Sequence, residues 1–482
     1  MKNLIITFVF ICQFGLCAHA QSNLKVHEWG TFTTVQNSNG VRLSGLKGEV
    51  LPPFVMDLKL NECATCNQGQ AGKVTLKNIG VQMETPVLYF YTNQETPITV
   101  DVTFKNGIIN QWYPQRSGGQ ANPNTATLDM ASMGDGSIKW NATVLAATQN
   151  LTPTSPNSQV TQEWAAPRAT AANYVKGQNN EIEKFLFYRG LANFATPFKV
   201  EFNDKGNLVI QNLFNTTLPY IMVYDNSPNR QPTFWWSGPI NGQEKKVIMP
   251  PRRDTEFNDM YNEVMRFRNE LVTAGLHLDE ATAMLQTWYD GYFTDVTDVK
   301  GLRVFWITPK SYIDEMLPLQ ITPTPSDIKR VFVGRSEVLT PDFESTLTQM
   351  SLTALENQYA DHRYLDVFKN GKSLGFPNQW TTYNQNPITP IKEITDFQPA
   401  YLIVMPNPFS ESIIVSCDIK ESVPLDFFVI DMQGRVVKQW KEQPTTLGLF
   451  KKQYSLQAFP VGNYILKLQC GQQQWAVKIS KH

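Results

Sequence analysis

Two adjacent residues, His27 and Glu28, are of the types that bind metals or form an acid–base pair. They lie in the stretch His27-Glu28-Trp29-Gly30-Thr31-Phe32-Thr33, whose aromatic and threonine residues favour a strand. Neighbouring strand residues point to opposite faces, so both side chains line one site only if the strand bulges. No His-Glu-x-x-His helix accompanies them. We therefore predict a structural histidine beside Trp29 and no metal site.

A Cys-x-x-Cys pair, Cys63 and Cys66, has the spacing of a redox motif. Redox activity needs a helix N-terminus that lowers the pKa of the first thiol, whereas residues 67–72 have the composition of a loop. A zinc knuckle needs a second pair of cysteines, and residues 21–370 contain none. The spacing therefore predicts a local disulfide between Cys63 and Cys66.

Two further stretches have the chemistry of binding sites. Arg252 and Arg253 could hold a carboxylate or phosphate at a helix start, but a turn capped by Asp254 is the simpler interpretation. The run Phe234-Trp235-Trp236 could stack on sugar rings, or it could pack in a core as most tryptophans do. The two catalytic carboxylates of a glycosidase have no fixed spacing in sequence, so such a pair cannot be located from the sequence.

No signature of a cofactor enzyme is present. The sequence lacks a dinucleotide fingerprint, a phosphate loop and a Gly-x-Ser-x-Gly elbow, and we predict no cofactor. The 482 residues balance 42 Lys and Arg against 43 Asp and Glu, for a net charge of −1. A nucleic-acid binder would show a basic stripe, so we expect no nucleic-acid partner.

The N-terminus has the pattern of a signal peptide over residues 1–20. Lys2 precedes an apolar run, and Ala18-His19-Ala20 is a small-x-small cleavage site. Cleavage after Ala20 would leave Gln21 first, able to cyclise. The apolar run is too short to span a membrane, and no other long apolar run follows, so we expect no transmembrane segment after removal of the signal.

Residues 21–370 are predicted to form one β-rich body. Alternating and apolar runs with turn signals between them predict a two-sheet, sandwich-like unit over residues 24–245. Apolar residues then recur at helical spacing near 256–293, with Gly275 between two segments, which predicts an αα-hairpin laid against the sheet. Strands follow at 302–307 and 330–333, then a further helix at 343–359. Residues 371–400 have the composition of a linker.

Residues 401–482 are predicted to form a small β-sandwich of their own. Short alternating strands surround the turn residues Asp431-Met432-Gln433-Gly434. Two cysteines of this module, Cys417 and Cys470, stand on apolar strand faces, either as a cross-strand bridge or as buried thiols.

This module resembles the type A C-terminal sorting domain of the bacterial type IX secretion system. The resemblance rests on four motifs in order: Pro406-Asn407-Pro408-Phe409, Asp431-Met432-Gln433-Gly434-Arg435-Val436-Val437, Gly462-Asn463-Tyr464-Ile465-Leu466-Lys467-Leu468 and Lys478-Ile479-Ser480-Lys481. It implies recognition by secretion machinery at the outer membrane, translocation, and usually removal of the domain. The expected location is extracellular or attached to the cell surface.

The body is similar to a family of bacterial secreted proteins to which no activity can be transferred. The similarity rests on 27–33, on Met83-Glu84-Thr85-Pro86-Val87-Leu88-Tyr89-Phe90-Tyr91, on Phe187-Tyr188-Arg189-Gly190-Leu191 and on Val331-Phe332-Val333-Gly334-Arg335. Two functions therefore remain open for the body. The first is binding or interaction, with a glycan or another surface ligand as partner. The alternative is an extracellular hydrolase acting on polysaccharide or peptide.

Overall fold

The structure of the chain is a computed structural model. It describes residues 23–47, 51–58, 63–67, 70–72, 74–121, 125, 127–146, 151–155, 162–225, 233–236, 238–248, 260–294, 301–360, 362–376, 402–405, 409–419, 424–431, 435–444, 448–470 and 473–481. The predicted signal peptide with Ala20 and Gln21, the pair Arg252 and Arg253, and most of the predicted linker lie outside these residues.

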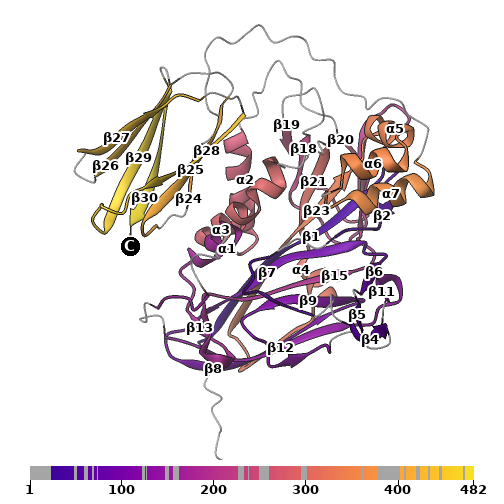
Figure 1. The fold of residues 1–482 in the computed structure, drawn as a ribbon, viewed down its shortest axis with the longest axis horizontal. Helices are drawn as coiled ribbons and strands as arrows, with labels where there is room; N and C mark the ends of the chain where they lie inside the picture. The colour runs from indigo at the N-terminus through magenta and orange to yellow at the C-terminus, as the bar shows by residue number, and fades with distance from the viewer. Residues whose placement is uncertain are drawn as a thin grey trace, which may run out of the picture.

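A ten-stranded sheet organises the described part of the body (Figure 1). Its order is β19-β18-β21-β23-β1-β7-β15-β9-β3, with β2 also paired to β1. The strands are β19 (Thr233–Trp236), β18 (Ile221–Asp225), β21 (Leu302–Thr308), β23 (Asp327–Val338), β1 (Lys25–Gln36), β7 (Val81–Tyr91), β15 (Leu186–Ala192), β9 (Gly107–Tyr113), β3 (Met56–Asp57) and β2 (Arg42–Leu43).

Strand β1 lies at the centre of this sheet. Every residue of β1 after Lys25 is buried, including the polar ones. It pairs antiparallel with β7 and parallel with β23, from Lys25 opposite Asp327 to Gln36 opposite Val338. Parallel partners need a long connection, and here about 300 residues separate β1 from β23. The predicted strand at 27–33 is therefore the central strand of the body.

Smaller sheets cover one face of the large sheet. Apolar side chains of both layers, such as Phe32 and Phe332 from the large sheet with Val100, Trp140 and Ile210 from the smaller ones, form one core. This packing of sheet on sheet confirms the sandwich-like body. The smaller sheets comprise β14 (Ile182–Glu183), β13 (Val175–Lys176), β12 (Gly136–Val144), β8 (Thr96–Phe104), β22 (Leu319–Thr322) and β10 (Gly118–Gly119), then β16 (Phe198–Phe202), β17 (Leu208–Asn212) and β20 (Lys245–Ile248). Two short pairs are β11 (Thr127–Asp129) with β6 (Thr75–Lys77), and β4 (Cys63–Asn67) with β5 (Gln70–Gly72).

Helices cover the opposite face of the large sheet. The predicted αα-hairpin is present as α2 (Met260–Thr273) and α3 (Leu278–Tyr289), continued by a π-helical turn, η4 (Asp290–Thr294). Phe267 of α2 and Met284 of α3 share a core with Trp29, Tyr89 and Val331 of the sheet. The helix α1 (Gln162–Arg168) joins this group, and α4 (Lys310–Met316) lies between β21 and β22 in sequence.

A second helical group follows β23. Where the sequence predicts one helix at 343–359, the structure has α5 (Pro341–Gln349) and α6 (Leu352–Gln358), because Ser351 caps a new helix by accepting a bond from the Ala354 N–H. The helix α7 (Leu365–Leu374) extends past residue 370, where the linker is predicted to begin. Its Val367 and Phe368 pack with Val35 of β1. Figure 1 shows α5 to α7 as a group apart from α1 to α3.

One carboxyl group in this second core gives the body a pH dependence. Glu344 of α5 is 2% exposed and accepts bonds of 2.6 Å from both the N–H and the hydroxyl of Ser38. Burial raises the pKa of Glu344 to about 7, against the lowering effect of these bonds. Because the folded pKa is raised, the stability linked to this group is complete below the unfolded pKa near 4.3 and is lost as pH rises to about 7.

We expect Glu344→Gln to flatten that dependence. A shift of this size corresponds to about 3 kcal/mol of unfolding free energy between pH 4.5 and 8. Denaturant unfolding at several pH values measures it. The same change at Glu356, whose side chain is 48% exposed, is the control and should leave the pH slope unchanged. Equal pH slopes of the unfolding free energy for Glu344→Gln and the parent protein would show that ionisation of this carboxyl group does not destabilise the fold.

The C-terminal module is a small two-sheet sandwich, as predicted. One sheet contains β24 (Ile403–Met405), β25 (Ser412–Ile419) and β28 (Gly448–Ser455), and the other β27 (Val436–Glu442), β26 (Leu425–Asp431), β29 (Gly462–Cys470) and β30 (Gln473–Lys481). Cys417 and Cys470 are buried on strands of different sheets. The core of the module is built from residues 402–479 alone, so the module and the body have separate cores.

Among the helices that the structure describes, none combines the length and the hydropathy needed to cross a membrane.

Candidate functional site: a buried arginine seam

A polar seam separates the two helical groups on one face of the large sheet. Trp29, Thr31, Thr33 and Val35 alternate along β1 and therefore share a face. Trp29 packs in the core with α2 and α3, and Val35 packs in the core with α5 to α7. The threonines between them face neither core. We call the charged and polar residues that gather here the arginine seam: Thr33, Gln82, Glu84, Arg303, Arg335, Glu337 and Arg363.

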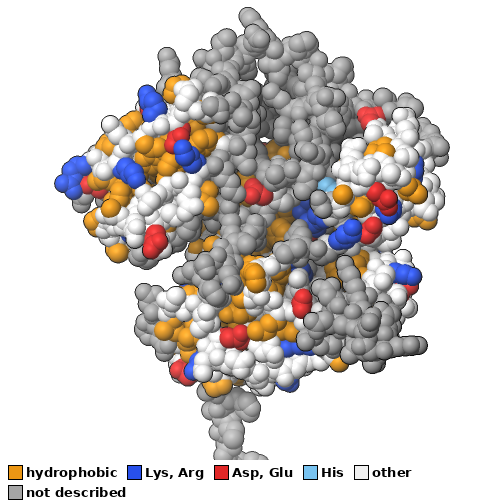
Figure 2. Space-filling model, in the orientation of Figure 1, with side chains coloured by type: hydrophobic (Ala, Val, Ile, Leu, Met, Phe, Trp, Pro, Cys, Tyr) orange, Lys and Arg blue, Asp and Glu red, His pale blue; other side chains and the backbone are white. Residues whose placement is uncertain are grey.

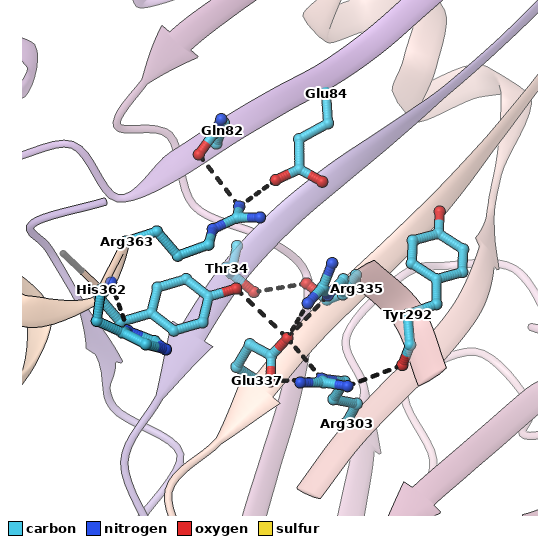
Figure 3. Close-up of polar contacts among 10 residues, drawn as sticks. Thr34, Gln82, Glu84, Tyr292, Arg303, Arg335, Glu337, His362 and Arg363 are labelled. Carbon is cyan, nitrogen blue, oxygen red and sulfur yellow. Dashed lines mark hydrogen bonds and ion pairs between the residues drawn. The ribbon is translucent and has the colours of Figure 1, made fainter. Parts of the chain in front are cut away.

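Glu337 holds two buried guanidinium groups together (Figure 3). The Arg303 Nε donates to both carboxylate oxygens at 3.0 Å, and the Arg335 Nε donates to Oε1 at 2.8 Å. Arg303 and Arg335 are each 1% exposed and Glu337 is 8% exposed. Burial raises the pKa of Glu337, but the charges of Arg303 and Arg335 outweigh it and lower this pKa to about 2. The carboxylate therefore stays ionised in this dry setting.

Two other residues complete this end of the seam. The backbone carbonyl of Tyr292, in η4, accepts a bond of 2.9 Å from the Arg303 Nη1. The Tyr292 hydroxyl lies 2.5 Å from the Thr31 hydroxyl, and burial raises its pKa. The Tyr364 hydroxyl, just before α7, donates to Glu337 at 3.4 Å. Both helical groups are thus tied to the same carboxylate network.

Arg363 closes the other end. Its Nη2 donates to Gln82 Oε1 at 3.3 Å and to Glu84 Oε1, and Figure 3 shows its guanidinium between these two β7 side chains. Glu84 and Gln82 are fully buried. Counted as ionised, the seam has three guanidinium groups, those of Arg303, Arg335 and Arg363, against the carboxylates of Glu84 and Glu337. Opposite charges thus meet at both ends of the seam.

Three seam residues stand side by side across three strands. Thr33 of β1 is the register partner of Gln82 on β7 and of Arg335 on β23. Each has a buried polar atom without a hydrogen-bond partner in the structure, namely Thr33 Oγ1, Gln82 Nε2 and Arg335 Nη1. All three atoms can donate. We call Thr33, Gln82 and Arg335 the donor row.

Buried polar atoms are nearly always paired, so a row of three calls for an explanation. An oxygen-rich group is the kind of partner that such donors bind, although the seam also holds an unpartnered carboxylate oxygen, Glu84 Oε2.

The donor row lies close to the surface of the body. A side-chain carbon built at Gly291, which is partly exposed, would lie 3.6 Å from Arg335 Nη1. Arg363 itself is partly exposed. Figure 2 shows Lys, Arg and His side chains together at the surface where the helical group α5 to α7 adjoins the sheet. A small ligand thus has a short way from solvent to the seam.

His27 and Glu28 point to opposite faces of β1, as the strand geometry predicts. His27 Nδ1 lies 2.8 Å from Glu280 Oε2 on the helical side. Glu28 is fully buried on the other side, where it accepts from the Arg330 Nε at 2.5 Å and from the Tyr188 hydroxyl. The two residues therefore belong to different clusters, and Glu28 forms a buried ion pair within the core between the sheets.

The other predicted site residues are not brought together with the seam. Cys63 lies on β4, which forms a hairpin with β5 where the sequence predicts a loop, and the side chains of Cys63 and Cys66 lie outside the described ones. The disulfide stays a prediction. Trp235 and Trp236 lie on β19, and their side chains too lie outside the described ones.

The sequence analysis missed the arginine seam. A signal exists in the strand runs Leu302-Arg303-Val304 and Val333-Gly334-Arg335. Arginine is rarely buried unless it is paired, so a guanidinium inside an apolar strand predicts a buried partner. The identity of that partner cannot be read from the sequence.

A surface cleft of about 690 Å³ lies elsewhere on the body. Its lining includes the amides of Asn106, Asn193 and Asn215 and the apolar groups of Phe194 and Leu213. Glu315 is the one carboxyl group that lines it among the described residues. The cleft thus lacks the convergent carboxylates that a glycosidase would need there.

Comparison with protein families identifies the C-terminal module. Residues 403–482 match the family described as secretion system C-terminal sorting domain. The module is therefore the sorting tail of the type IX secretion system, and the chain is secreted cargo of that system. Such a tail implies interaction with the secretion machinery and passage across the outer membrane. The match covers the tail and leaves the body unassigned. No curated protein matches the chain.

Solved structures give no closer guide to the body. The chain is 12% identical to the MHC-like protein MILL2, over 54% of this chain and 98% of that one, with a TM-score of 0.13. It is 8% identical to a tetra-tandem repeat of the extending region of a large adhesion protein, over 94% and 73%, with a TM-score of 0.12. It is also 8% identical to Escherichia coli alpha-2-macroglobulin, over 86% and 32%, with a TM-score of 0.16. These scores are too low to support any inference.

Proposed function

We propose that the body is an extracellular binding unit that holds a small anion, or one acidic group of a larger molecule, against the donor row. The observation that supports this function is the row itself: Thr33, Gln82 and Arg335 present three buried donor atoms without partners on adjacent strands. Because these unpartnered atoms are donors, the ligand group should offer acceptor oxygens. Carboxylate, phosphate and sulfate groups all have the required oxygens.

A carboxylate-bearing sugar is the ligand class that best fits a secreted protein. It combines the acidic group that the donor row would hold with the glycan partner expected from the sequence. Since the seam lies beneath Gly291 and beside Arg363, one charged group can enter while the rest of the ligand stays at the surface.

Titration calorimetry of the full mature chain with glucuronate, phosphate and sulfate tests this function, with glucose as the neutral comparison. We expect saturable binding of the anions and none of glucose. Gln82→Glu keeps the shape and the oxygen that faces Arg363 but replaces a donor with a charged acceptor. It should weaken anion binding by about tenfold or more, since a hydrogen bond to a charged group contributes about 1.5–3 kcal/mol.

Thr33→Val and Thr34→Val form a matched pair for the same experiment. Both remove one hydroxyl from β1, but the Thr34 hydroxyl bonds to Ser336 on the opposite face at 3.2 Å. Only Thr33→Val should weaken the anion. If no anion binds saturably, or if both threonine variants behave alike, the donor row is a hydrated structural feature and the proposed function is wrong.

Export supplies the remaining parts of the proposal. We infer removal of residues 1–20 with Gln21 as the new N-terminus, a Cys63–Cys66 disulfide in the oxidising compartment, and release or surface attachment after translocation. The alternative of an extracellular hydrolase stays a prediction without located catalytic residues.

A further inference from the structure

A second cluster lies at the other end of β1, where α3 begins. His27 of β1, His277 before α3 and Glu280 of α3 each offer one ligand atom, and these three atoms lie within 4.8 Å of one another. We call these residues the histidine cluster. Their types are those that bind zinc and other divalent transition metals.

The geometry is close to that of a metal site. Zinc holds imidazole nitrogens and carboxylate oxygens at about 2.0–2.2 Å, so neighbouring ligand atoms of a tetrahedral site lie about 3.4 Å apart. His27 Nδ1 and Glu280 Oε2 lie 2.8 Å apart and are buried. His277 is exposed, and its ring centroid lies 4.4 Å from that of His27. His277 is the one ligand residue of the three that is exposed.

The carboxylate of Glu280 is held in place by one hydroxyl from outside the cluster and by one backbone N–H of the cluster itself. The Tyr91 hydroxyl donates to Glu280 Oε1, and the His277 backbone N–H donates to Glu280 Oε2 at 2.7 Å. The rings of Tyr91 and His277 also meet edge to face at 4.9 Å. Outer partners of this kind orient ligands in metal sites. His277 is also the N-cap residue of α3, which places the second histidine where the helix begins.

We propose that His27, His277 and Glu280 bind one divalent transition metal ion, with zinc as the best fit, and that the ion joins the start of α3 to β1. Three protein ligands leave a fourth position, which faces solvent on the side of His277. The sequence analysis predicts no metal site because His27 and Glu28 point to opposite faces and no His-Glu-x-x-His helix accompanies them. The fold brings His27 to His277, 250 residues away, and this grouping gives a reason to revise that prediction. The site is distinct from the donor row, since six residues of β1 span about 20 Å.

Zinc titration of the full mature chain, after treatment with a chelator, tests the proposal. We expect one equivalent to bind, to raise Tm, and to give visible absorption bands when cobalt replaces zinc. His277→Ala removes an exposed ligand and should fold normally. It should weaken binding by more than about tenfold, because even the loss of an outer partner costs about 10–100-fold in affinity.

Leu278→Ala is the matched control, since Leu278 is the next residue and 56% exposed but cannot bind a metal. It should bind zinc as the parent protein does. Failure of the parent chain to bind zinc overturns the proposal. So does binding by His277→Ala with unchanged affinity and an unchanged cobalt spectrum, because the ion would then lie on other ligands.

Discussion

Without residues 401–482 the protein is expected to remain inside the cell envelope, with secretion into the medium or onto the surface reduced to background. The predicted signal peptide would still deliver the truncated chain across the inner membrane, but the sorting module that the secretion machinery recognises would be missing. Immunoblots of medium, surface and periplasmic fractions of the native bacterium measure the outcome.

The structure makes this truncation a fair test of export. The three cores of the body contain no residue beyond Phe376, and the core of the module contains no residue before Leu402. We therefore expect the truncated protein to fold and to resist proteolysis in the periplasm. A reporter protein with the signal peptide at one end and residues 401–482 at the other is the complementary control and should be exported. Truncated protein in the medium at parental levels would show that the module is not the export signal.

Elements whose apolar periodicity lies within one short segment could be predicted from the sequence alone. The αα-hairpin was predictable because the apolar spacing on both sides of Gly275 already marks the buried faces of α2 and α3. The break between α5 and α6 was missed because the prediction followed the apolar spacing, which continues across the break. Ser351, a typical helix-capping residue, marks the start of the second helix. The C-terminal strands were predictable from turn residues between alternating runs.

Long-range pairing could not be predicted. Nothing near Thr33 indicates that Arg335 lies beside it, because the parallel register of β1 and β23 is set by packing of the whole body. The same holds for Glu28, whose buried carboxylate is paired with Arg330, 302 residues away, and with the Tyr188 hydroxyl. Sequence analysis could identify buried charges as anomalies, but their partners, and thus the seam and the histidine cluster, needed the fold.

Glu337→Gln is expected to destabilise the body by about 3–5 kcal/mol, the largest effect of any single substitution proposed for it. The neutral amide would remove the carboxylate that both Arg303 and Arg335 contact, and neither guanidinium can lose its proton. The lowering of the Glu337 pKa from 4.5 to about 2 corresponds to about 3 kcal/mol, which agrees with that range. Thermal and denaturant unfolding measure the loss.

Acid conditions test the same carboxylate in the parent protein. Because the folded pKa is lowered, its contribution is complete above the unfolded pKa near 4.3 and is lost as pH falls towards 2. Glu337→Gln should therefore unfold with a shallower acid dependence over this window. Glu356→Gln removes the carboxylate of an exposed pair with Lys369, and should cost no more than about 1 kcal/mol. Equal losses for the two variants would mean that the seam is solvated.

Glu337→Gln should lower the stability of the body and raise its affinity for anions. Removing the Glu337 carboxylate makes the charge of the seam more positive by one, while Thr33, Gln82 and Arg335 keep all three donor atoms. An anion that enters the seam of this variant would restore the missing counter-charge. We therefore expect phosphate or glucuronate to bind the variant more tightly than the parent protein and to recover part of its lost Tm, since a ligand of the folded state stabilises it by mass action. A variant that is destabilised but gains no affinity for anions would assign the seam to folding alone.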